Sequence, residues 1–296
     1  MSTHIVIMAG GVGSRLYPLS TPEKPKQFLD LLDCGKSLIR LTYERFLAVD
    51  PSARFWVVTS GQYVPYVYEQ LPQIPREQVL AEPVARNTAP CIAYACRKIA
   101  LRYPDANIVV TPSDAFVPDH EAFARTVRTA LSFTSQRESI VCLGIRPDYP
   151  SCEYGYIKDI PGDILRADGR SFEEGGEVIR KVDSFKEKPS VEVAAEYLRS
   201  GGYWWNAGIF IWNVQTVEKQ LRLYVPQIEE KMDDLSPALY TPAEQAALEE
   251  IFPQCEKISI DYALMETSPD IYLAPCRWEW SDLGSFEALE KVKNSR

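Results

Sequence analysis

The sequence predicts an α/β fold with a largely parallel sheet, and three observations carry the prediction. Short apolar runs of strand length alternate with segments of helix length, which is typical of this class. The strand-like runs are rich in Val and Ile, as expected for strands that are buried on both faces. The chain has 296 residues, of which 46% are hydrophobic and 25% charged, so it is long enough for one large domain with an ample core.

The predicted elements of the first half follow one another in a regular order. An Asn-Thr pair before the third helix suits its N-terminal cap. After residue 147 the pattern loosens, and the sequence indicates a surface hairpin or loop at 161–177. Strands are expected at 5–8, 55–59, 108–111 and 140–145, and helices at 37–49, 63–71, 88–102 and 121–135. A second set of elements is expected to include 178–187, 208–212 and 271–275.

Composition argues against several classes of function. The formal net charge of -9 disfavours a nucleic-acid-binding surface. No apolar run approaches the ~20 residues of a membrane span, and the N-terminus lacks the pattern of a secretory signal, so we expect a cytoplasmic protein with no membrane partner. The seven cysteines form no C-x-x-C pair and indicate reduced, mostly buried thiols. The two histidines are too few for a histidine metal centre or a Ser-His-Asp triad.

A glycine-rich run follows the first predicted strand. Gly10, Gly11 and Gly13 precede Arg15, and no Gly-Lys-Ser/Thr step follows, so the run is not a P-loop. A dinucleotide-binding loop needs a third glycine where this chain has Leu16. Two interpretations remain: a plain tight turn, or a loop whose backbone N–H groups and cations hold an anion.

Eight motifs occur in order along the chain, and the first is this loop, MAGGVGSRLYPLSTPEKPKQF at 8–28. The others are EPVARNTAP (82–90), TPSD (111–114), EYGYI (153–157), FKEKP (185–189), WNAGIFIW (205–212), ISIDYALME (258–266) and WSDLG (280–284). The set resembles the sugar-1-phosphate nucleotidyltransferases, and within them the mannose-1-phosphate guanylyltransferases. The resemblance spans essentially the whole chain. It implies a Rossmann-like nucleotidyltransferase fold with three αβα layers and a central mixed, mostly parallel sheet.

The resemblance implies an enzyme that transfers GMP from GTP to mannose 1-phosphate and releases pyrophosphate. Arg15 is then expected to clamp the β and γ phosphates, Lys26 the α-phosphate, and Lys188 the phosphate of the sugar. Lys24 is interpreted as a solvated surface charge. The residues expected to approach the triphosphate through their backbone N–H groups are Gly10, Gly11, Gly13 and Ser14.

Two aspartates are the candidate metal ligands. Asp114 follows a predicted strand, which places it at the carboxyl end where ligands bind in parallel sheets. Asp282 lies in a predicted turn before Gly284, where it either shapes the turn or binds a ligand. The resemblance implies that both bind Mg²⁺ or Mn²⁺. Relatives commonly carry His after the first of these aspartates, whereas this chain has Ala115, so a hydrogen bond that orients Asp114 is expected to be missing.

Specificity is expected from two further groups of residues. The N–H donors of guanine need acceptors, which Glu82 or backbone carbonyls nearby can supply. Asn87 and Thr88 either cap a helix or contact the nucleotide. Trp204 and Trp205 either flank the sugar or belong to the core, and the core is favoured for at least one of them. The positions that match sugar-binding residues of the family are Gly155, Glu187, Asn206 and Asp261.

Two alternatives to this function remain open. The chain can be a nucleotidyltransferase for another sugar 1-phosphate or nucleotide, or a catalytically silent homologue that binds GDP-sugars. We expect a catalytic domain at 1–284 and a helical tail at 285–296, without the C-terminal module usual in the family. If that module builds the oligomer, a weak homodimer is expected.

Overall fold

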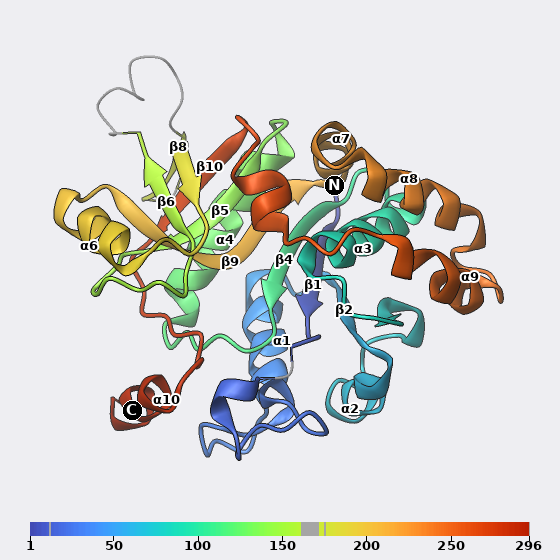
Figure 1. Cartoon of the computed structure of the whole chain (residues 1–296), viewed down its shortest axis with the longest axis horizontal. Coiled ribbons are helices and arrows are strands. Elements are labelled where there is room, and N and C mark those ends of the chain that lie inside the picture. Colours follow the sequence, from blue (N-terminus) through green and yellow to red (C-terminus); the bar gives the residue numbers. More distant parts are fainter. Residues whose placement is uncertain (12, 161–171, 175, 296) are drawn as a thin grey trace.

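The computed structural model describes residues 1–11, 13–160, 172–174 and 176–295, and a ten-stranded sheet runs through its centre (Figure 1). The strand order is β3-β2-β1-β4-β9-β5-β10-β8-β6, with β7 paired to β8. The strands are β1 (Thr3–Met8), β2 (Arg54–Ser60), β3 (Val79–Glu82), β4 (Asn107–Pro112), β5 (Ile140–Ile145), β6 (Tyr156–Asp159), β7 (Phe172–Glu174), β8 (Glu177–Lys186), β9 (Tyr203–Asn213) and β10 (Ile271–Cys276).

The sheet is mixed, as expected, and most of its strands point the same way. β1, β2, β3 and β4 pair in parallel, and so do β5 and β10. β9 lies antiparallel between β4 and β5, and β8 lies antiparallel to β10 and β6. The predicted α/β class and the four predicted strands of the first half are confirmed, and the second set of predicted elements forms β8, β9 and β10. The short strands β3 and β6 were not predicted.

Helices cover both faces of the sheet, which confirms the three-layer arrangement (Figure 1). On one face Val6 and Val110 belong to a core shared with α3, α7 and α8. On the other face Ile7 packs in a core with Phe46 of α1 and Phe123 of α4. The helices are α1 (Leu38–Val49), α2 (Val64–Gln70), α3 (Thr88–Arg102), α4 (His120–Ser135), α6 (Val191–Ser200), α7 (Val214–Tyr224), α8 (Pro226–Leu235), α9 (Glu244–Ile251) and α10 (Phe286–Asn294).

The last helix, α10, packs against the segment that follows β1. Leu289 and Val292 of α10 are buried in a third apolar cluster with Leu16, Leu38 and Leu283. This cluster ties the segment after β10 to the loop after β1. The helical tail expected after residue 284 is therefore present, and its apolar residues hold two distant motifs together.

Several smaller expectations can be compared with the structure. Five of the seven cysteines are buried and none is bonded to another, as predicted. β7 and β8 form an antiparallel pair within the expected hairpin, of which residues 161–171 and 175 lie outside the described part. Trp205 is buried in the core, as favoured for one of the two tryptophans. In the described part of the chain, no helix has the length and apolar character needed to cross a membrane.

Candidate functional site

Side chains that follow the loop after β1 in the sequence contact the backbone of this loop. Gln27 Nε2 donates hydrogen bonds to the carbonyls of Ala9 and Gly11, at 3.0 and 2.8 Å. Gly13 has φ 60°, and a Cβ there would lie 2.6 Å from Ser20 Oγ, so this position requires glycine. Gln27 was not recognised in the sequence, although it directly follows Lys26 in the first motif. Specific side-chain contacts thus fix the described backbone of this loop, which a plain tight turn would not need.

Lys26 lies at the centre of the site. Its ammonium is 3.1 Å from Asp114 Oδ2 and donates a 2.9 Å hydrogen bond to the carbonyl of Asp282. The residue is 8% exposed, so its charge acts in a place with little water to screen it. Arg15 is more exposed, and its guanidinium pairs with Glu153 and lies 3.8 Å from Asp282 Oδ2. The two cations predicted to bind the triphosphate therefore lie beside the two predicted metal ligands.

A short backbone bridge brings the two aspartates to the same place. Phe116 and Ser281 exchange N–H···O hydrogen bonds of 2.8 and 3.1 Å, so the segment after β4 lies beside the segment after β10. Asp282 Oδ1 accepts hydrogen bonds of 3.0 Å from the Tyr154 hydroxyl and from the Gly284 N–H. Asp282 thus shapes its turn, which confirms that interpretation, and it also faces Arg15 and Tyr154; its binding of a metal ion stays a prediction.

The carboxylates of Asp114 and Asp282 suit a magnesium ion that is bound both by protein carboxylates and by phosphate oxygens. Asp114 and Asp282 supply two carboxylates, and Mg²⁺ usually binds one or two carboxylates, substrate phosphates and water. No group of three or more His, Cys, Asp or Glu side chains that could hold a metal ion occurs in the described residues. These residues therefore suit an ion that arrives with a triphosphate better than a metal held by protein alone.

The five residues predicted to bind the sugar phosphate come from the start of β6, the end of β8, from β9 and from the helical turn Asp261–Met265, and they are Gly155, Glu187, Lys188, Asn206 and Asp261. Asn206 Nδ2 donates to Asp261 Oδ1 at 2.9 Å, and the Asn206 N–H donates to the Gly155 carbonyl at 2.8 Å. Lys188 donates to Glu187 Oε1 at 2.6 Å. A Cβ on Gly155 would lie 2.5 Å from Glu187 Oε2, so only glycine leaves room for that carboxylate. The cluster offers the carboxylate, amide and ammonium groups that a phosphorylated sugar needs.

The charges in this cluster influence one another. The pKa of Asp261 is raised to about 7, first because it is removed from water and then because Glu187 is close; Lys188 opposes this rise. Burial alone would lower the pKa of Lys188, but its hydrogen bond to Glu187 and the carboxylate of Asp261 raise it. The cluster therefore contains a buried carboxyl group with a raised pKa, and groups with perturbed pKa values are common in ligand-binding sites.

Glu82 lies beside the glycine loop. Burial raises its pKa to about 7, and its Oε1 atom is buried without a hydrogen-bond partner in the described part of the structure. A Cβ on Gly10 would lie 3.5 Å from its other oxygen. An unpaired buried acceptor is costly, so Glu82 is well suited to accept hydrogen bonds from a ligand.

Asn87 and Thr88 form the start of α3. Asn87 has φ 66° and accepts a 2.9 Å hydrogen bond from the Thr88 N–H, as an N-terminal cap. Thr88 Oγ1 accepts a 2.8 Å hydrogen bond from the Ile260 N–H, next to Asp261. The capping interpretation of Asn87 is confirmed, and Thr88 connects α3 with the sugar cluster. Contact of either residue with a nucleotide stays a prediction.

Comparison with known proteins places the chain in a family. A family model described as nucleotidyl transferase matches residues 4–295. The chain belongs to the nucleotidyl transferase family. Among curated members, a mannose-1-phosphate guanylyltransferase of Escherichia coli strain K12 is 35% identical over 295 residues, which cover 97% of this chain and 59% of the relative. One from Salmonella montevideo is 34% identical over 292 residues, covering 98% and 59%. The chain thus spans about three fifths of the length of these relatives.

A solved structure supports the same placement among nucleotidyl transferases. The protein named mannose-1-phosphate geranyltransferase from Thermus thermophilus is 33% identical and superposes with a TM-score of 0.84. The match covers 99% of this chain and 79% of that one. The arrangement of strands and helices described above is therefore that of a solved relative.

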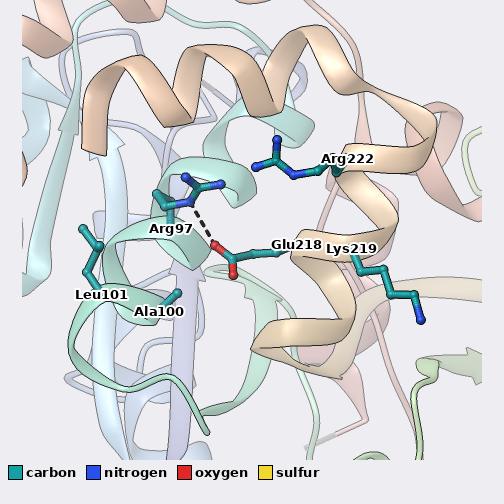
Figure 2. Close-up of a pocket in the computed structure, with 6 residues that line it drawn as sticks. All are labelled: Arg97, Ala100, Leu101, Glu218, Lys219 and Arg222. Atoms are coloured by element: carbon teal, nitrogen blue, oxygen red, sulfur yellow. Dashed lines mark hydrogen bonds and ion pairs between the residues drawn. The ribbon is translucent and has the colours of Figure 1, made fainter. Parts of the chain in front are cut away.

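Two of the larger hollows in the described structure lie apart from the glycine loop. One, of about 410 Å³, is lined by residues of α3 and α7, and Figure 2 shows Arg97 directed at Glu218 in it. Arg97 also pairs with Glu229 and Asp233, so its charge is already compensated. The other, of about 910 Å³, is largely aromatic and borders the site where Tyr154 contacts Asp282. Neither contains the cations of the glycine loop.

Proposed function

We propose that this chain transfers GMP from GTP to mannose 1-phosphate, giving GDP-mannose and pyrophosphate. The observation that carries the proposal is the position of Lys26, which contacts Asp114 and the backbone of Asp282 next to the glycine loop. The names of the similar proteins support the choice of guanine and mannose. Two anions must approach each other in this reaction, so the site has to offset their repulsion.

The nucleotide would occupy the glycine loop. Its phosphates would displace the carboxylates that now pair with Arg15 and Lys26, since phosphate binds both cations more strongly than one carboxylate does. Glu82 would accept hydrogen bonds from the N1–H and N2–H₂ donors of guanine, which gives its unpaired oxygen a partner. When bound, Mg²⁺ would neutralise charge on the triphosphate between Asp114 and Asp282.

The sugar phosphate would occupy the cluster formed by Gly155, Glu187, Lys188, Asn206 and Asp261. Glu187 and Asp261 can accept hydrogen bonds from sugar hydroxyls, and Lys188 would hold the phosphate. A phosphate oxygen of the sugar then attacks the α-phosphorus in line, and pyrophosphate leaves on the opposite side. Lys26 would stabilise the charge that builds on the α-phosphate in the transition state.

Pyrophosphate release tests the proposal. Purified protein is given GTP, mannose 1-phosphate and Mg²⁺, and each component is omitted in turn. Release that requires all three supports the proposal, and parallel reactions with ATP, UTP, glucose 1-phosphate and galactose 1-phosphate test its specificity. Release that is faster with another nucleotide or sugar would overturn the assigned substrates, and no release with any pair would leave a binding protein.

A further inference from the structure

Arg45 is a buried arginine that the reaction described above does not use. It lies on α1, is 2% exposed, and has no ion-pair partner in the part of the chain that the structure describes. Its Nη1 donates a 2.9 Å hydrogen bond to the Ala115 carbonyl, and its Nη2 donates a 3.0 Å bond to Thr42 Oγ1. The guanidinium carbon lies 5.2 Å from the centre of the Phe123 ring. The hydrogen bonds of this buried cation therefore go to neutral groups.

These contacts surround one predicted metal ligand. Thr42 Oγ1, which accepts from Arg45, donates a 3.2 Å hydrogen bond to the Ser113 carbonyl. The carbonyls before and after Asp114 are thus both tied to α1, one directly by Arg45 and one through Thr42. Ala115 offers no polar side chain to orient Asp114, so α1 fixes this turn through its backbone.

Burial of the Arg45 guanidinium costs free energy that a purely structural contact would not require. Burial lowers the pKa of Arg45 to about 10, and the nearby Asp114 carboxylate opposes this fall. Attachment of α1 to the turn by packing alone would need no buried charge, since apolar residues of similar volume are often as stable. The forked donor fixes the direction of a carbonyl, which packing does not.

We propose that Arg45, with Thr42, is a positioning residue that holds the Asp114 carboxylate in the direction needed to bind the metal ion. This inference rests on the proposed function, because it takes Asp114 as a metal ligand. Arg45 touches neither substrate nor ion; it acts through the backbone on both sides of Asp114.

Mn²⁺ binding to the protein–GTP complex, followed by electron paramagnetic resonance in the absence of sugar phosphate, tests the inference independently of turnover. Arg45→Met removes the charge and the donors, Arg45→Lys keeps the charge but loses the fork, and Thr42→Val removes one link. Arg128→Met is the matched control, because Arg128 also donates to backbone carbonyls, those of Ala48 and Val49. Melting curves identify any variant that fails to fold.

We expect Arg45→Met and Arg45→Lys each to weaken Mn²⁺ binding by about tenfold or more, as loss of a group that orients a metal ligand does. Thr42→Val should weaken it less, and Arg128→Met should not change it. GTP binding in EDTA should stay the same in every variant. If Arg45→Met does not fold, Arg45→Lys and Thr42→Val decide the question.

Two results would overturn the inference. Unchanged Mn²⁺ binding in folded Arg45 variants would show that Arg45 only stabilises the fold. Tighter binding in Arg45→Met would show that the guanidinium acts on the ion only by repulsion. A wild-type protein whose Mn²⁺ binding is unaffected by Asp114→Asn would instead remove Asp114 as a metal ligand, and the inference with it.

Discussion

We expect Asp261 to make the stability of the protein depend on pH, and Asp261→Asn should remove this contribution. The carboxyl group is buried beside Glu187, and its pKa is raised from 3.8 to about 7 in the folded state. The folded protein therefore binds a proton more tightly here than the unfolded chain does. Its contribution is most favourable below about pH 4 and is lost as pH rises through about 7.

The size of the effect follows from the shift. About three pKa units at roughly 1.4 kcal/mol each correspond to a loss on the order of 4 kcal/mol in the free energy of unfolding between about pH 4 and pH 7. Asn at this position can still accept the hydrogen bond from Asn206, so the variant loses the charge and keeps the contact. His4, whose pKa is lowered to about 4 mainly by burial, acts in the opposite direction between about pH 4 and 6.5.

Urea unfolding of both proteins between pH 4.5 and 8.5 measures the effect. The difference between variant and wild type isolates Asp261, because His4 contributes to both. We expect Asp261→Asn to gain stability relative to wild type as pH rises. A difference between the two proteins that stays flat with pH would refute the reasoning, since the carboxyl group would then titrate as it does in the unfolded chain.

Three further predictions concern the site. Asp114→Asn and Asp282→Asn should each cost several kcal/mol of transition-state stabilisation, with GTP binding in EDTA unchanged; near-normal turnover in either would remove that residue from the metal site. Lys188→Ala should chiefly raise KM for the sugar phosphate and Lys26→Ala should chiefly lower kcat, and steady-state kinetics showing the reverse would exchange their roles. Gln27→Ala should raise KM for GTP, because it frees two carbonyls of the glycine loop; unchanged kinetics would mean that the loop keeps its shape without it.

The sequence was most informative where local pattern decides structure. β1, β2, β4 and β5 are apolar runs buried on both faces, so composition alone reveals them. β3 and β6 have only four residues each, too few for a pattern to emerge. The reversed direction of β9 depends on how distant strands pair, which no local pattern encodes.

The same contrast between local sequence pattern and contacts of distant residues applies to the candidate site. Residues within recognisable motifs, such as Asp114 and Lys188, were found by resemblance, and the structure places them in contact with other predicted site residues, Lys26 and Glu187. Gln27 and Arg45 were not found, because they act on backbone carbonyls 16 and 70 positions away. Tyr154, which donates to Asp282, lies in a recognised motif, but its partner is 128 positions away. Contacts of this kind become visible only after folding.

Oxygen labelling tests the central claim most directly. Mannose 1-phosphate carrying ¹⁸O in its phosphate group is incubated with GTP, Mg²⁺ and the protein, and the products are analysed by mass spectrometry. The account predicts that GDP-mannose retains the label and that pyrophosphate contains none, because the sugar phosphate oxygen attacks the α-phosphorus. Labelled pyrophosphate, or the absence of any GDP-mannose, would contradict it.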